Sequence, residues 1–322
     1  MSDAVARLKA QLPEHPSVDE LTPLADDYTG LRILAVHAHP DDESSKGSAS
    51  AAAYTDRGAR YMVATMTGGE RGDILNEEIK HSPRAHRDLP GMRRSEMAAA
   101  AKAIGIEHRW MGFVDSGLPE GDPMPPLPFG CFGVQPLERA AAPLVRLVRE
   151  YRPHAMISYD EIGGYPHPDH IMSHKVAVEA YEKAGDPEAY VGEGQPWAPL
   201  KLYYDRAFNP ERLVAGHEFL MARDGQSVFS GGIENLVDQV STEGIRHESI
   251  TRIPSSAYFD RRDQAMLAHA SQIDPNGAFF AIPTEDVKKV WPWEDYTLIA
   301  SRVPVDLPEC CLADGLDYKA AG

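Results

Sequence analysis

Apolar runs alternate with segments of helical character over the first part of the chain. Four β-prone apolar runs lie at residues 31–38, 60–66, 108–114 and 154–159. Four segments with helical composition or spacing lie at residues 45–57, 93–105, 137–151 and 170–183. This repeated order of strand, loop and helix is typical of a parallel α/β sheet.

The pattern is weaker at both ends of the chain. We expect a helix at 4–11, strands at 201–208 and 296–303, a helix at 256–272, a helical insertion or cover at 211–244 and a long loop at 117–136. The chain therefore predicts an α/β fold, a doubly wound, mostly parallel, Rossmann-like sheet with additional C-terminal strands and helices that form part of the active-site cleft. We divide it into an N-terminal extension (1–30), one large domain (31–308) and a C-terminal tail (309–322).

The composition of the 322 residues is that of an ordinary globular protein, with 43% apolar and 25% charged residues. A net charge of −17 argues against binding to nucleic acid or to an anionic membrane, because both need clustered lysine and arginine. Three cysteines, two of them adjacent, are too few for a disulfide framework. The chain has neither an apolar run of about 20 residues nor the start of a signal peptide, so we expect a cytoplasmic protein.

Two predicted loops at the carboxyl ends of strands contain the sequence His-Pro-Asp, at residues 39–43 and 167–170. The carboxyl ends of parallel strands meet at one edge of a sheet, where ligands bind. His39, Asp42 and His170 would together offer two imidazoles and one carboxylate, which is the open ligand set of a catalytic zinc ion. Fe(II) uses the same set, so ligand type alone does not fix the metal.

The residues beside these ligands are those that a metal-dependent hydrolase needs. Asp41 is a candidate general base that takes the proton of an attacking water. His167 is a candidate for stabilising the oxyanion or protonating the leaving amine, and Tyr165 for donating a hydrogen bond to that oxygen. An isolated histidine or aspartate at a strand end is more often a turn former or helix cap. Ligand-type residues in both loops favour the metal site over that structural explanation.

Other candidates carry a weaker signal. Residues 67–73 form a glycine-rich loop without nucleotide-binding spacing, which suits either a tight turn or a substrate lining. Arg93, at the predicted start of a helix where a cation is unfavourable, is either a surface residue or a contact for a substrate oxygen. Asp115 is either a turn residue or an acceptor for a sugar hydroxyl.

Three further polar residues lie on predicted helices. Lys46 follows Asp42 by four positions, near the predicted start of a helix, and its long stem either extends into solvent or reaches over the site. His269 and Gln272 are three residues apart, so we predict that they share one helix face.

The two His-Pro-Asp loops resemble the LmbE-like (PIG-L) family of zinc-dependent N-deacetylases. Within that family, five segments resemble the branch that hydrolyses mycothiol S-conjugates; they are residues 38–47, 67–75, 112–123, 163–170 and 268–275. The chain departs from the family pattern at Pro166, in its N-terminal extension and over residues 211–246.

The resemblance implies roles for ten residues. It implies a zinc site of His39, Asp42 and His170, with Asp41 as general base and His167 as electrostatic stabiliser or acid. Tyr165 matches the position that polarises the carbonyl, Asp169 the one that orients His167, and Arg93 and Asp115 those that bind the glucosamine–inositol part. The amidase-like pattern also has lysine at the position of Lys46, which favours a contact of Lys46 with the cysteinyl group.

The resemblance also implies the reaction. The substrate would be a small-molecule thiol conjugate, a mycothiol S-conjugate, cut at the amide that joins glucosamine to its S-substituted N-acetylcysteine. The products would be a mercapturic acid and glucosaminyl-inositol, in detoxification or in natural-product maturation. One alternative is a deacetylase of N-acetylglucosaminyl-inositol, with the same zinc chemistry. The other is a non-catalytic sugar-binding protein, which predicts the loss of a ligand or of Asp41, and neither is lost.

Overall fold

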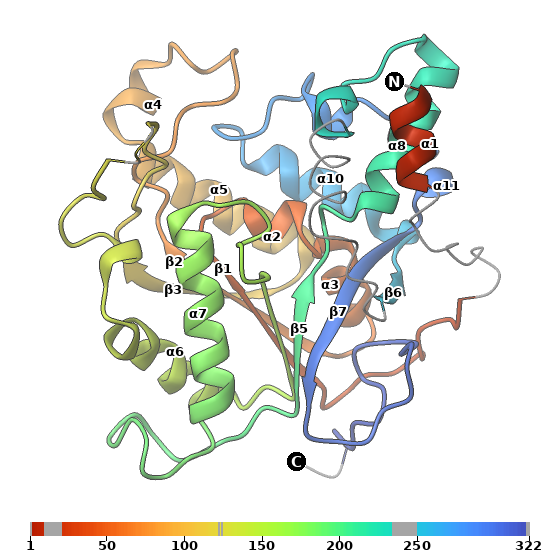
Figure 1. Cartoon of the computed structure of the whole chain (residues 1–322). Coiled ribbons are helices and arrows are strands. Elements are labelled where there is room, and N and C mark those ends of the chain that lie inside the picture. The colour runs from red at the N-terminus through yellow and green to blue at the C-terminus, as the bar shows by residue number, and fades with distance from the viewer. Residues whose placement is uncertain (1, 10–20, 122, 124, 234–249, 320–322) are drawn as a thin grey trace.

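The computed structural model describes residues 2–9, 21–121, 123, 125–233 and 250–319, and a seven-stranded sheet runs through its centre (Figure 1). The strand order is β3-β2-β1-β4-β5-β7-β6. The first five of these are parallel, β7 is antiparallel to β5, and β6 is antiparallel to β7. The strands are β1 (Arg32–His37), β2 (Arg60–Thr67), β3 (Glu107–Phe113), β4 (Ala155–Ser158), β5 (Lys201–Asp205), β6 (Ile250–Pro254) and β7 (Trp293–Ser301).

Helices lie on both faces of the sheet. The α-helices are α1 (Ser2–Lys9), α2 (Asp42–Ser45), α3 (Ser48–Thr55), α4 (Pro83–Arg87), α5 (Leu89–Ile104), α6 (Leu137–Tyr151), α7 (Pro168–Lys183), α8 (Pro210–Asp224), α10 (Phe259–Ala268) and α11 (Thr284–Val290). Short 3₁₀ helices are η2 (Phe132–Val134), η3 (Ser256–Tyr258) and η4 (Ala278–Phe280). Among the described residues, no helix combines the length and apolar character needed to cross a bilayer.

Alternate residues of β1 enter two separate cores. Ile33 and Ala35 pack with residues of α3, α5 and α10, whereas Leu34 and Val36 pack with residues of α6 and α7. Figure 1 shows α7 in front of the sheet and α3 and α5 behind it. A strand buried on both faces has a continuous apolar sequence, which explains the apolar run at its position. The predicted doubly wound, mostly parallel fold is confirmed.

Several predicted element bounds are wrong. The helix predicted at 45–57 is α3, which begins only at Ser48, because Gly47 adopts a left-handed φ of 92° and separates it from the short helix α2. α5 begins at Leu89, so Arg93 lies in its second turn and not at its start. α10 ends at Ala268, so His269 and Gln272 do not share a helix face. The edge strand β6 was not predicted, since Ile250–Pro254 contains Thr, Arg and Pro and lacks an apolar run.

The two ends of the described chain pack on the body of the protein. α1 contacts α8 through the apolar cluster of Val5, Leu8, Val214 and Ile233. α8 and the helical residues 230–233 belong to the insertion predicted at 211–244, of which residues 234–244 lie outside the described residues. Near the other end, Leu312 is buried beside Tyr54, whose hydroxyl oxygen accepts a hydrogen bond from the Leu312 N–H. The division into extension, domain and tail stays a prediction.

Candidate metal centre and active site

The candidate site lies where the strand order of the sheet reverses. β1 and β4 are neighbours in the sheet although β2 and β3 lie between them in the chain. α3 then packs on one face of the sheet and α7 on the other. The loops that follow β1 and β4 therefore leave the same edge in opposite directions, which is the position at which ligands bind in open α/β sheets.

The three predicted metal ligands meet at this edge, and all three are buried. His170 Nε2 lies 3.4 Å from Asp42 Oδ2, and His39 Nδ1 lies 3.7 Å from the same oxygen. One nitrogen or oxygen atom from each residue lies within 4.8 Å of the others. Donors bound about 2.0–2.1 Å from one tetrahedral zinc ion are separated by roughly 3.3–3.5 Å, so the observed spacing suits a shared ion.

The protonation pattern of His170 also fits a metal. Its Nδ1 lies 2.9 Å from the Gly163 carbonyl oxygen, which accepts a hydrogen bond from Nδ1–H. The proton of the neutral ring is therefore on Nδ1, and Nε2 carries a lone pair. Within the described part of the chain, this Nε2 is buried without a hydrogen-bond partner. Burial lowers the pKa of His170 to about 3, so its ring stays neutral, as a ligand must be. Two imidazoles and a carboxylate suit zinc or Fe(II), and the geometry does not choose between them.

Asp42 is held as an anion by its surroundings. The Lys46 ammonium lies 2.6 Å from Oδ1, and the Tyr159 hydroxyl donates to Oδ2 at 2.8 Å. Burial alone would raise the pKa of Asp42, but the neighbouring His170, Lys46 and His39 hold it well below its usual range. Tyr159 was not predicted as a site residue, because its only signal is its position at the end of the apolar run 154–159.

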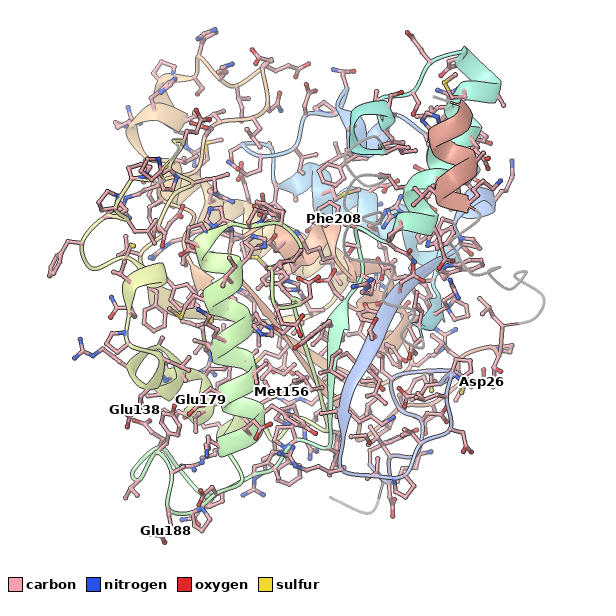
Figure 2. All side chains as sticks on the ribbon, in the orientation of Figure 1. Asp26, Glu138, Met156, Glu179, Glu188 and Phe208 are labelled. Atoms are coloured by element: carbon pink, nitrogen blue, oxygen red, sulfur yellow. The ribbon has the colours of Figure 1, made fainter. Side chains whose placement is uncertain are left out.

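Lys46 differs from its prediction in position and surroundings. It follows the last residue of α2, at the end of a helix where a cation is favourable, and it is buried. Its ammonium forms an ion pair with the Asp42 carboxylate. The predicted contact of Lys46 with substrate stays a prediction. The ring of Phe208, half exposed beyond the end of β5 in Figure 2, lies 5.7 Å from the Lys46 nitrogen.

His39 is oriented by Asp169. The Asp169 Oδ2 lies 3.3 Å from His39 Nε2 and accepts the backbone N–H of Ser116 at 2.9 Å. Burial would lower the pKa of His39, but Asp115 and Asp169 raise it to about 10 by accepting from its ring, so the ring is protonated without a metal, and an ion bound at Nδ1 would displace that proton. With Nε2 turned to these carboxylates, Nδ1 faces Asp42. The Asp169 carboxylate contacts His39 and Ser116, an arrangement typical of histidines that bind metals, and its implied role of orienting His167 stays a prediction.

His167 and Tyr165 border the metal position on the side of α7. The His167 Nδ1 accepts the backbone N–H of Asp169 at 3.1 Å, so the ring proton is on Nε2. Burial and the neighbouring His39 lower the pKa of His167 to about 4, which leaves it neutral near pH 7. The ring of Tyr165 is 4.5 Å from that of His170, and burial raises the pKa of its hydroxyl. Both groups are therefore hydrogen-bond donors at neutral pH.

Asp41 is next to Asp42 in sequence but faces different partners. Its Oδ1 lies 3.4 Å from an Arg93 nitrogen, and its side chain remains 24% exposed. Burial raises the pKa of Asp41, while Arg93 opposes that rise. Arg93 is itself buried and donates to the carbonyl oxygens of Pro40 and Gly69 at 2.7 and 3.0 Å. It thus supports the Asp41 loop, and its predicted contact with substrate stays a prediction.

Asp115 is also engaged within the protein. Its carboxylate accepts the backbone N–H groups of Arg71 and Gly117 at 2.9 and 2.7 Å, which joins the loops after β2 and β3. Asp115 and His167 also belong, with His39 and Asp169, to a second group of donor atoms within 4.8 Å of one another. Its role toward a sugar stays a prediction.

The fold and the site together define an α/β enzyme with a candidate metal centre at the switch point of its sheet. The chain belongs to the PIG-L family: the family model described as GlcNAc-PI de-N-acetylase matches residues 34–181. This match contains all ten residues for which a role in the site was predicted.

Relatives extend the likeness to most of the chain. The mycothiol S-conjugate amidase of Streptomyces coelicolor is 46% identical over 292 residues, which cover 90% of this chain and 99% of the relative. The 1D-myo-inositol 2-acetamido-2-deoxy-alpha-D-glucopyranoside deacetylase of Streptomyces avermitilis is 36% identical over 281 residues, 85% of this chain and 93% of that one. The family and these relatives make the protein a hydrolase of amide carbon–nitrogen bonds.

A solved structure shares the fold. The N,N'-diacetylchitobiose deacetylase from Pyrococcus horikoshii superposes with a TM-score of 0.55 over 83% of each chain, at 14% sequence identity. At that identity the comparison shows the arrangement of helices and strands only.

Proposed function

We propose that this protein is a zinc-dependent amidase that cuts mycothiol S-conjugates between glucosamine and the S-substituted N-acetylcysteine. The gathering of His39, Asp42 and His170, with a buried His170 Nε2 that has no hydrogen-bond partner among the described residues, supports a metal-dependent hydrolase. The preference for this substrate is supported by 46% identity to an amidase named for it, against 36% to a deacetylase.

The chain's own residues would share the chemistry as follows. His39, Asp42 and His170 would hold the ion. Such an ion, when bound, lowers the pKa of a water molecule and polarises a carbonyl group. Asp41 would remove a proton from the attacking water, whose oxygen forms the new bond to the amide carbon. His167 and Tyr165, both donors near neutral pH, would stabilise the carbonyl oxygen as charge develops on it. The carbon–nitrogen bond then breaks, and the proton passes to the leaving amine.

The second candidate is the deacetylase reaction on N-acetylglucosaminyl-inositol. It needs the same residues and releases acetate in place of the mercapturic acid. The 36% identity to the Streptomyces avermitilis deacetylase supports it as the alternative. In either case the substrate is a small sugar-containing molecule, and we propose that the enzyme acts in the cytoplasm.

Product analysis distinguishes the two reactions. Purified zinc-loaded enzyme is given a mycothiol S-conjugate and N-acetylglucosaminyl-inositol separately, and the products are identified by mass spectrometry. We expect release of mercapturic acid with a higher kcat/KM than release of acetate. A higher kcat/KM for acetate release would assign the deacetylase reaction, and no turnover of either compound would refute both.

A further inference from the structure

The backbone of Asp41 is in an unusual conformation. Its φ is 134° and its ψ is −27°, and among the described residues it is one of three non-glycine residues with positive φ. Side chains other than glycine rarely adopt this region, because Cβ approaches the backbone too closely. Such a conformation persists only when the surrounding structure enforces it, and it is found most often at active sites.

Glu43 provides that enforcement from two residues further on. Its Oε2 accepts the backbone N–H of Asp41 at 2.9 Å. Its Oε1 lies 2.6 Å from His269 Nε2, and neither side chain is more than 1% exposed. A buried carboxylate needs charged or hydrogen-bonding partners to remain in place, and Oε1 has two, His269 and the Ser44 hydroxyl, which donates to it.

His269 is fixed by the segment that contains it. The chain turns immediately after α10, where the N–H groups of Gln272 and Ile273 donate to the His269 carbonyl oxygen at 2.9 Å. The N–H and the hydroxyl of Ser271 donate to the Glu96 carboxylate on α5, at 2.8 and 2.6 Å. The segment 268–275 is one of those that carry the family resemblance, and none of the roles given above uses it.

We propose that Glu43 and His269 are positioning residues, which hold the backbone of Asp41 so that its carboxylate is placed to act as the general base. The inference rests on the proposed role of Asp41. It explains why two neighbouring carboxylates serve different partners: Asp42 contacts His170 and Tyr159, whereas Asp41 contacts Arg93. Neither Glu43 nor His269 would touch the substrate.

The test compares Glu43→Ala, Glu43→Gln and His269→Gln with the wild-type enzyme. We expect Glu43→Ala to lower kcat by roughly 100-fold, the loss that a displacement of about 1 Å can cause, with KM and zinc content close to wild type. Glu43→Gln keeps an oxygen that can accept the Asp41 N–H, so it should recover at least tenfold of that loss. A crystal structure of Glu43→Ala should show Asp41 outside the positive-φ region.

Glu309→Ala is the matched control. Glu309 is a buried carboxylate paired with Lys201, at the amino end of β5 and so at the opposite edge of the sheet. This variant should lose stability but keep the wild-type kcat at a temperature where it is folded. If Glu43→Ala does not fold, His269→Gln decides through the same measurements.

Three results would overturn the proposal: wild-type kcat in the folded variants, an unchanged Asp41 backbone in the Glu43→Ala structure, or a loss of activity that follows loss of zinc. All rates are expressed relative to wild type on whichever amide the wild type cleaves. If the proposed substrate is wrong, the wild-type enzyme will not cleave it. If the positioning role is wrong, the ratio of variant kcat to wild-type kcat will stay near one on the amide that the wild type does cleave.

Discussion

At the scale of single residues, the site depends on two adjacent aspartates with different surroundings. Asp42 is nearly enclosed by His39, His170, Lys46 and Tyr159, whereas Asp41 keeps part of its carboxylate exposed. Burial raises the pKa of Asp41 although Arg93 opposes that rise, whereas the neighbouring His170, Lys46 and His39 hold the pKa of Asp42 well below its usual range. An anion of low basicity suits a metal ligand, and a more basic carboxylate suits a proton acceptor.

Matched substitutions should separate these two roles. Asp41→Asn should retain zinc and lower kcat by roughly 10²–10⁴-fold, because a general base is removed while the ligands remain. Asp42→Asn should instead lose zinc during dialysis, because a neutral amide is a poorer ligand. Metal analysis of the dialysed proteins, together with kcat measured at saturating zinc, checks both. Equal zinc loss in the two variants would show that the roles are assigned wrongly.

Much of the candidate site could be predicted at this scale, and the reason is local. His39, Asp41 and Asp42 lie in one loop and His167, Asp169 and His170 in another, so short motifs at two strand ends were enough to find them. The partners of these residues could not be predicted in the same way. The contacts of Asp42 with Tyr159 and of Glu43 with His269 join positions 117 and 226 residues apart, and no local pattern contains them.

At the scale of elements, a break at residues 46–47 separates α2, which begins with Asp42, from α3. Composition predicted one helix over residues 45–57, because alanine and serine do not reveal a turn. The break depends on Gly47, whose φ of 92° allows the chain to turn beside Tyr296. A Cβ at this position would lie 2.5 Å from the Tyr296 hydroxyl oxygen. Tyr296 is buried and its hydroxyl pairs with Ser50, so it has little freedom to move away.

Substitution of Gly47 by alanine should therefore destabilise the fold through two effects. The left-handed backbone costs about 1–2 kcal/mol for a residue with a Cβ, and the overlap with Tyr296 adds roughly 1–3 kcal/mol. Gly225→Ala is the control, because Gly225 has a φ of 71° but nothing within 4 Å of its Cβ position. Urea unfolding should show a clearly larger loss for Gly47→Ala. Equal losses in the two variants would exclude a steric role for Tyr296.

At the scale of the whole molecule, a buried ion pair ties the end of the chain to the centre of the sheet. Lys201, the first residue of β5, is fully buried and pairs with Glu309, whose other oxygen accepts the Tyr203 hydroxyl at 2.8 Å. The Lys201 ammonium also donates to the Asp314 carbonyl oxygen. The segment after Pro308 thus completes the core near β5, although its sequence gave no sign of such a role.

Removing one partner of this pair should be more damaging than removing both. Glu309→Ala leaves the Lys201 charge buried and unpaired, for which we expect a loss of about 3–5 kcal/mol in the free energy of unfolding. The double variant Lys201→Met with Glu309→Leu replaces the pair by apolar groups and should lose less than either single change. Denaturant unfolding of the three variants measures this. A double-variant loss equal to the sum of the two single losses would show that the residues act independently.

The contact between Glu43 and His269 has a consequence for how enzymes of this design diverge. All residues proposed to act on the amide lie between His39 and His170, inside the part of the chain that the family model matches. The later half contributes the Phe208 ring beside Lys46 and, through His269, a support for the base. Substitutions in the later half that leave its core contacts intact should therefore change the groups proposed to act on the amide less than substitutions between His39 and His170. The exception is the segment that follows α10, because His269 contacts Glu43 beside the ligand loop.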